Sequence, residues 1–289
     1  MDQRIIALYD DYTHGGMNRR MFLNRLSLLA GGTAAAAALL PLLENNYARA
    51  DILPETDPRI SAETVDVPGM TGLKGYLVQP KTAGRRPAVL VIHENRGLNP
   101  HITDITRRVA AEGYLALGLD YLSTAGGTPT NEDRARDMIG QLSPDQALAS
   151  SQAAIAYLKG RPDGTGKAGA IGFCWGGAAV NALAVSGAEF EAGVAYYGRQ
   201  PPAEKVAAIR APLLLHYAGL DQPVNAGVPA YEAALKAAGK PYELHLYEGA
   251  NHAFNNDTNA ARYDKAAADL AWRRTMDFFA RHLGAAQPA

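Results

Sequence analysis

The strongest constraint on how this chain can fold is a regular alternation of short apolar runs with longer segments of helical spacing. The runs "PAVLVIHE" (87–94) and "YLALGLDYL" (114–122) are almost continuously apolar, as expected of strands that are covered on both faces. This order predicts an α/β fold with a mostly parallel sheet and helices on both faces. We predict strands at 73–80, 87–94, 114–122, 167–173, 190–198, 212–219 and 242–249, and helices at 101–113, 144–160, 175–187, 227–239 and 262–283.

Composition narrows the range of functions. The 289 residues are 47% hydrophobic and 20% charged, with a formal net charge of −1, so nothing favours nucleic acid or an anionic membrane as a partner. The single cysteine, Cys174, excludes an intramolecular disulfide and a cysteine-based zinc cluster. The chain has neither a G-x-G-x-x-G pattern nor a phosphate loop, which argues against a nucleotide cofactor.

The first fifty residues have the layout of an export leader. "NRRMFLNRL" resembles a twin-arginine signal, with Arg19 and Arg20 ahead of an alanine-rich apolar run and the cleavage pattern "ARA". We therefore expect residues 1–50 to lie outside the fold, to engage the twin-arginine export machinery and to be removed before Asp51. The mature chain, 51–289, would then be one periplasmic domain without stable membrane association. The alternative is an uncleaved leader that anchors the protein in the membrane.

A glycine-rich stretch, "IGFCWGGA" (171–178), places Cys174 at the junction of the predicted strand 167–173 and helix 175–187. The pattern Gly-x-Cys-x-Gly is that of a nucleophile elbow, a sharp turn that holds the nucleophile in a strained conformation above the sheet. The helix N-terminus lowers the pKa of a thiol there, and its N–H groups can receive an oxyanion. The alternative is a small buried thiol in a tight turn, and the motif alone does not decide between the two.

Two further residues fit the partners that such a nucleophile needs. An acid and then a histidine are expected after it along the chain, each in a loop at the carboxyl edge of the sheet. Asp221 and His252 directly follow the last two predicted strands. A turn-closing aspartate and a surface histidine are the alternatives, but the joint placement favours a triad with Cys174. The remaining histidines fit the role of base less well: His93 precedes the cysteine, His216 and His245 lie inside strands, His101 and His282 lie on helices, and His14 lies in the leader.

The segment "HENRG" (93–97) follows the second predicted strand and supplies further candidates. The loop at this place in a sheet with a nucleophile elbow provides one oxyanion donor, for which we predict the N–H of Asn95. The other donor is the N–H of Trp175, the residue after the candidate nucleophile. Glu94 lies at the end of this strand. It can be explained as an exposed carboxylate, as an ion-pair partner of Arg96, or as part of the candidate active site.

Together, "HENRG", "GFCWGG", "LD" at 220–221 and "NHAF" resemble the dienelactone hydrolase family, and the likeness extends over nearly all of residues 60–283. The resemblance implies a single-domain α/β-hydrolase fold and hydrolysis of a lactone or small carboxylic ester through a thioester. It implies Cys174 as the nucleophile, His252 as the base and Asp221 as the residue that orients the base. It also implies that Glu94 contacts the resting thiol and helps to generate the thiolate. No metal ion or organic cofactor is implied.

The chain departs from the family pattern where the substrate carboxylate is bound. The family's two clamping arginines are absent: "LDYLSTAGG" (119–127) contains none, and Asn256 stands four residues after His252. We therefore expect neutral lactones or short-chain esters to be better substrates than dienelactone. Arg96, Arg199 and Asn256 are candidate substrate-binding residues, although each arginine is equally well explained as a surface residue.

Two other functions stay open on the sequence alone. The chain could be a non-catalytic binding protein, because fold does not determine function. It could also be a thiol redox protein that uses Cys174, which would need an external thiol because the chain has no second cysteine. Turnover of small aryl esters would argue against the binding protein, and hydrolysis that survives reversible oxidation of Cys174 would argue against a thioester mechanism.

Overall fold

The computed structural model describes residues 1–50 and 52–284. Its strands are β1 (Ile60–Asp66), β2 (Lys74–Pro80), β3 (Arg86–Ile92), β4 (Leu115–Asp120), β5 (Gly164–Phe173), β6 (Ala192–Tyr196), β7 (Leu213–Ala218) and β8 (Tyr242–Tyr247). They form one eight-stranded sheet in the order β1-β2-β4-β3-β5-β6-β7-β8. Strands β3 to β8 pair in parallel, whereas β2 pairs antiparallel with both β1 and β4. The predicted α/β class with a mostly parallel sheet is therefore confirmed.

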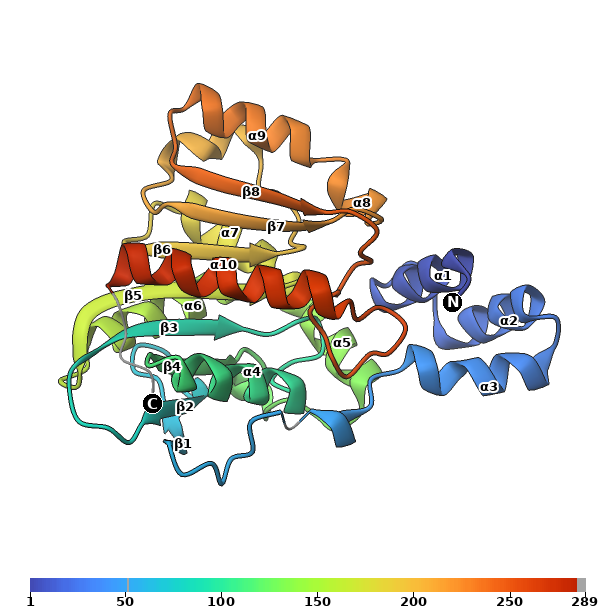
Figure 1. The fold of residues 1–289 in the computed structure, drawn as a ribbon, viewed down its shortest axis with the longest axis horizontal. Coiled ribbons are helices and arrows are strands. Elements are labelled where there is room, and N and C mark those ends of the chain that lie inside the picture. Colours follow the sequence, from blue (N-terminus) through green and yellow to red (C-terminus); the bar gives the residue numbers. More distant parts are fainter. Residues whose placement is uncertain (51, 285–289) are drawn as a thin grey trace.

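Helices cover both faces of this sheet and enclose two apolar cores (Figure 1). One face is covered by α4 (Pro100–Ala111) and α10 (Lys265–Leu283), and the other by α5 (Glu132–Gln141), α6 (Pro144–Gly160), α7 (Trp175–Val185) and α9 (Val228–Ala237). Short elements complete the chain: α8 (Gln222–Asn225), η1 (Tyr47–Arg49), η2 (Ser123–Ala125) and η3 (Ala203–Ala208). Every residue of β3 is buried, which explains why its sequence is a continuous apolar run.

One strand and one longer helix of the hydrolase body, β1 and α5, were not predicted, nor were the short elements α8, η2 and η3. β1 is an edge strand that buries only its first residue fully, so its sequence lacks the apolar run of the central strands. α5 has the polar sequence "EDRARDMIGQ" and buries only Ala135 and Ile139. So few apolar positions give almost no periodic signal in the sequence.

The first fifty residues, here called the N-terminal segment, do not lie outside the fold as we expected. They form α1 (Gln3–Thr13), α2 (Arg19–Ala30) and α3 (Thr33–Leu43), which lie beyond the carboxyl ends of the parallel strands (Figure 1). Phe22 and Leu26, from the stretch that resembles a signal, are fully buried in a small apolar cluster with Tyr9 and Tyr12. The rings of Tyr12 and Phe22 stack with centroids 4.6 Å apart. An apolar helix that packs against neighbouring helices has the same composition as the apolar part of an export leader. The sequence therefore did not distinguish a folded segment from a leader.

The outer surface of α2 and α3 remains partly apolar. Leu28 is 83% exposed, whereas Arg19 is held by Glu44 and Asp133. No single helix in the described part of the chain is long and apolar enough to span a membrane, and α2 and α3 meet that test only as a pair bent by 113°. Export through the twin-arginine machinery therefore stays a prediction, and its predicted cleavage point, Asp51, lies outside the described residues.

Candidate active site

The three residues predicted as a triad come together at the carboxyl edge of the sheet. Cys174 lies in the turn between β5 and α7, Asp221 follows β7, and His252 follows β8. His252 Nδ1 donates a hydrogen bond to Asp221 Oδ2 at 2.6 Å, and both side chains are buried. Neutral His252 therefore has its lone pair at Nε2, an atom that is buried and has no hydrogen-bond partner among the described residues. A ring nitrogen of His252 and the sulfur of Cys174 lie within 4.8 Å of each other.

The backbone at this site is strained. Cys174 has φ 54° and ψ −111°, as expected of a nucleophile elbow. A Cβ on Gly172 would lie 2.1 Å from the carbonyl oxygen of Gly176, and a Cβ on Gly176 would lie 2.4 Å from a carbonyl oxygen of β3. The other non-glycine residues with positive φ in the described chain, Tyr197 (38°) and Ala253 (62°), also line the space around Cys174. Strain of this kind persists only where the surrounding structure enforces it, and it gathers at functional sites.

The charges of the three groups support one another. Burial raises the pKa of the Cys174 thiol, but the imidazoles of His252 and His14 lower it by more, to about 6. Burial lowers the pKa of His252, whereas the Cys174 thiolate and the Asp221 carboxylate raise it well above its ordinary value. Burial also raises the pKa of Asp221, but His252 brings it below the ordinary value. These shifts favour a thiolate beside an imidazolium at neutral pH.

Two main-chain donors belong to residues that line the cavity with Cys174. Asn95 and Trp175 both line the cavity at Cys174. Neither main-chain N–H donates a hydrogen bond to a described residue, and Trp175 is the first residue of α7, whose first N–H groups have no partner within the helix. The side chain of Asn95 donates a 2.6 Å hydrogen bond to the Thr13 carbonyl oxygen, which fixes its loop. The two N–H groups can therefore receive a carbonyl oxygen on which negative charge develops.

The structure changes the expected roles of Glu94 and Asn256. The hydrogen-bond partner of the thiol is His14, with 3.5 Å between Sγ and Nε2, and not Glu94. Glu94 is buried and accepts a 2.9 Å hydrogen bond from Asn256 Nδ2. Its other oxygen, Oε1, has no partner among the described residues, and the residue lines a small pocket beside Cys174. Asn256 is fully buried and lies outside the cavity lining. In this structure its amide holds Glu94 and does not face the cavity, so its predicted contact with substrate is not formed here.

The two candidate arginines have different surroundings. Arg96 is only 6% exposed, pairs with Glu132 at 3.2 Å and donates a 3.1 Å hydrogen bond to the hydroxyl of Tyr9. The charge of Arg96 is therefore paired within the protein. The alternative that Arg96 is a surface residue does not hold. Arg199 is exposed and lines the larger cavity. Of the two, Arg199 is the residue placed to meet a substrate.

A cavity of about 630 Å³ lies above Cys174, within the usual range for small-molecule sites. Three parts of the chain form its walls: the loops at the strand ends, α5 and, unexpectedly, the N-terminal segment. The charged side chains around it are mostly acidic. They are Asp10, Asp11, Asp137 and Asp221 against Arg136 and Arg199, in addition to the histidines.

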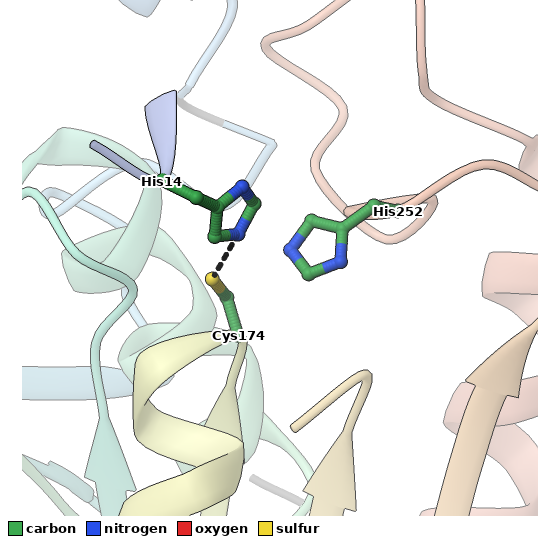
Figure 2. A group of neighbouring side chains, drawn as sticks. All are labelled: His14, Cys174 and His252. Carbon is green, nitrogen blue, oxygen red and sulfur yellow. Dashed lines mark hydrogen bonds between the residues drawn. The ribbon is translucent and has the colours of Figure 1, made fainter. Parts of the chain in front are cut away.

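Sequence reasoning missed His14, which had been set aside with the leader. Figure 2 shows its ring over the sulfur of Cys174 and next to the ring of His252. The two histidine rings lie edge to face, with centroids 4.6 Å apart. The sequence carries one signal for a helix here, because Ile5, Tyr9 and Tyr12 recur with helical spacing and pack into one apolar cluster. That spacing does not show which body of protein the helix packs against.

His14, Cys174 and His252 form a cluster whose donor atoms lie within 4.8 Å of one another, close enough to hold a metal ion. In this cluster His14 is hydrogen-bonded to Cys174, and Nδ1 of each histidine is bound by an oxygen atom. These contacts let the three side chains exchange a proton without an ion. His93, the rival base, is fully buried, stacks on Trp175 with centroids 5.3 Å apart and lies outside both pockets. It has no access to a substrate.

A mostly parallel eight-stranded sheet, with a strained elbow after β5 and acid and histidine loops after β7 and β8, is the architecture of an α/β-hydrolase. The class of protein is therefore a hydrolase of this fold. The chain belongs to the dienelactone hydrolase family, whose family model matches residues 73–283.

Individual relatives support this assignment. A protein of Methylorubrum extorquens named "Putative carboxymethylenebutenolidase" is 31% identical over 280 residues, covering 90% of this chain and 94% of the relative. "Putative hydrolase fragment YghX" of Escherichia coli is 50% identical over 113 residues, which cover 38% of this chain and 97% of the relative. The crystal structure of a "Putative Dienelactone Hydrolase" from Klebsiella pneumoniae superposes with a TM-score of 0.71 at 28% identity, covering 77% of this chain and 99% of that chain. A dienelactone hydrolase-like promiscuous phosphotriesterase from metagenomic libraries gives 0.70 at 26% identity, covering 78% and 100%.

The N-terminal segment has sequence relatives of its own. Residues 1–32 match a second family model, described as YqhI-like. The alignment with the Methylorubrum protein covers 90% of the chain, so it cannot be contained in residues 51–289 and extends into the N-terminal segment.

Proposed function

We propose that the chain hydrolyses a lactone or a small carboxylic ester through a thioester on Cys174. The observation that carries this proposal is the strained Cys174 backbone beside the 2.6 Å hydrogen bond between His252 and Asp221. A nucleophile on an elbow, a base within reach of it and an acid that orients the base are the parts of acyl transfer.

The first half of the reaction transfers the acyl group to sulfur. The Cys174 thiolate attacks the carbonyl carbon and forms a C–S bond, while the carbonyl electron pair moves onto oxygen. The N–H groups of Asn95 and Trp175 bind that oxyanion. When it collapses, the C–O bond to the leaving group breaks, and the alkoxide takes a proton from the imidazolium of His252. With a lactone, this alcohol stays attached to the acyl group.

The second half releases the acid. Neutral His252 takes a proton from a water molecule, and the resulting hydroxide attacks the thioester carbonyl. Collapse of this second oxyanion breaks the C–S bond and returns the thiolate. Asp221 holds the Nδ1–H of His252 throughout, so that Nε2 faces the reacting atoms.

The cavity favours a neutral substrate. The acidic side chains on its walls disfavour a carboxylate, and the buried Arg96 is held by Glu132 and Tyr9. Arg136 pairs with Asp133 and Asp137, so Arg199 is the cation left on the cavity wall to attract an anionic group. We therefore propose neutral lactones and short-chain esters as the substrate class. A neutral phosphotriester belongs in the same substrate panel, because one of the similar solved structures is described as a promiscuous phosphotriesterase.

The test is a comparison of wild type with Cys174→Ala on a panel of neutral lactones and aryl esters. We expect the variant to lose hydrolysis while keeping its melting temperature, and a slow substrate to leave an acyl adduct on Cys174 of the wild type by mass spectrometry. His282→Gln, a partly exposed change on α10, is the matched control. Full activity in Cys174→Ala, or an adduct at another residue, would refute the mechanism. No turnover of any ester would favour the binding protein, and hydrolysis that persists after reversible oxidation of Cys174 would leave a redox role open.

A further inference from the structure

His14 presents a basic nitrogen to the thiol. Its Nδ1 lies 2.7 Å from the carbonyl oxygen of Asp10, and because a carbonyl only accepts, Nδ1 must carry a proton. The neutral ring therefore has its lone pair at Nε2, which lies 3.5 Å from Sγ of Cys174. Nε2 can thus accept the S–H of the thiol.

His252 repeats this arrangement next to His14 (Figure 2). Its Nδ1 is bound by Asp221, and its Nε2 has no hydrogen-bond partner among the described residues. Two imidazoles, each fixed through Nδ1 to an oxygen, therefore lie around one thiol proton. This is more than a triad requires, since a triad has a single base.

The N-terminal segment that carries His14 is anchored to the hydrolase body by buried charges. Arg262 forms a 2.7 Å ion pair with Asp10. The guanidinium groups of Arg262 and Arg96 lie 5.0 and 6.0 Å from the ring centroid of Tyr9, and the two arginines are 5% and 6% exposed. Removing a partner from a buried charge is strongly destabilising, so the body of the protein needs this segment in place.

The first helix also has a second face for the cavity. Ile5, Tyr9 and Tyr12 pack into the segment's own apolar cluster. Other positions of α1 and the two residues after it line the cavity above Cys174, namely Gln3, Ala7, Asp10, Asp11, Thr13, His14 and Gly15. α1 is therefore amphipathic: its apolar face packs into the core of the N-terminal segment, and its polar face lines the cavity above Cys174.

We propose that the N-terminal segment is a working part of the active site, in which His14 is a fourth catalytic residue and the second proton acceptor of Cys174. The S–H bond breaks, an N–H bond forms at Nε2 of His14 or His252, and the electron pair stays on sulfur as the thiolate. The resulting imidazolium donates a hydrogen bond to that thiolate. This role rests on the proposed function, because it concerns the nucleophile assigned there.

The ionisation of Cys174 can be measured without any substrate. The titratable and charged groups around it come from every wall of the two pockets. They are Asp10, Asp11 and His14 on the N-terminal segment, Glu94 and Arg96 after β3, Arg136 and Asp137 on α5, Tyr197 and Arg199 after β6, Asp221 after β7, and His252 and Arg262 after β8. Of these, His14 is the exposed one that hydrogen-bonds the sulfur. His14→Gln keeps a polar side chain of similar reach that cannot take the proton, and it leaves the others in place.

The first experiment is the rate of Cys174 alkylation by iodoacetamide between pH 5 and 9, in full-length protein. We expect the wild-type rate to be half-maximal near pH 6. We expect the His14→Gln profile to move to higher pH by about one to two units, because the thiolate loses one charge-assisted hydrogen bond. Alkylation would then slow about 5- to 50-fold at pH 6 and hardly at all at pH 9. His282→Gln is the matched control. An unchanged profile in folded His14→Gln protein would overturn the role of His14.

The second experiment tests the wall of the cavity. Ala7 lines the cavity, whereas Arg4, on the same helix, is exposed and does not. We expect Ala7→Trp to raise KM by about tenfold or more with little change in kcat, and Arg4→Trp to leave both unchanged. Equal KM values in the two variants would mean that α1 is not a wall of the working site. The alkylation result separates this inference from the proposed function, because it does not depend on ester turnover.

Discussion

Replacing Asp221 by asparagine is the sharpest test of the proposed triad, because it removes one charge and almost no volume. The side chain of Asp221 accepts two hydrogen bonds in the structure. Its Oδ2 accepts the 2.6 Å hydrogen bond from His252, and its Oδ1 accepts a 3.4 Å hydrogen bond from the N–H of Val224 at the start of α8. Asparagine caps helices about as well as aspartate, so we expect Asp221→Asn to fold.

The expected loss has two components. A hydrogen bond to a charged group contributes about 1.5–3 kcal/mol, equivalent to a rate loss of about 10- to 150-fold. The asparagine amide can also face Nδ1 as a donor and thereby move the proton of His252 to Nε2, where the ring can no longer act as a base. The corresponding change in a serine-protease triad lowers kcat by about 10⁴-fold. We therefore expect kcat/KM to fall by about 10²- to 10⁴-fold.

The assay is kcat/KM on a neutral aryl ester between pH 5 and 9, together with the alkylation profile of Cys174. Because the imidazolium of His252 lowers the pKa of the thiol, we also expect the alkylation profile of Asp221→Asn to move to higher pH. Asp269→Asn, on the exposed side of α10 and paired only with Lys265 among the ion pairs, is the matched control. A variant that melts like wild type and hydrolyses the ester at the wild-type rate at every pH would refute the reasoning.

Two further predictions follow from the site, and a third follows from the N-terminal sequence. The pKa of Cys174 is lowered to about 6, so the thiolate is present above that pH and is lost below it. We therefore expect kcat/KM on a neutral ester to rise as the pH passes about 6. A rate that first rises near pH 9 would contradict a thiolate nucleophile. The acidic cavity walls predict that wild type prefers a neutral methyl ester to the matched carboxylate and that Arg199→Ala widens this preference; a tenfold or greater preference for the carboxylate would count against both statements. Replacing Arg19 and Arg20 by lysine is expected to retain the protein in the cytoplasm, and continued export would exclude the twin-arginine interpretation. N-terminal sequencing of the exported protein would then show whether cleavage at Asp51 removes His14, which the role proposed for His14 does not allow.

The sequence by itself determined the α/β architecture and the three residues at the centre of the site. The strands were predictable because a strand buried on both faces must be apolar throughout, as β3 is. Cys174, Asp221 and His252 were predictable because parallel strands end at one edge, so residues that directly follow β5, β7 and β8 must meet there. The glycines around Cys174 carried the same information, since only glycine fits the contacts of the elbow.

Only the tertiary structure decided which side chains those residues face. Glu94 bonds Asn256 instead of the thiol, and Arg96 is held under the N-terminal segment, because these contacts join residues that are distant in the chain. His14 reaches Cys174 from 160 positions away. Local periodicity could show that residues 3–14 form a helix with two faces, but an apolar helix has the same composition whether it packs on a domain or leaves as a leader. The difference lies in what its surface contacts, and no pattern along the chain records that.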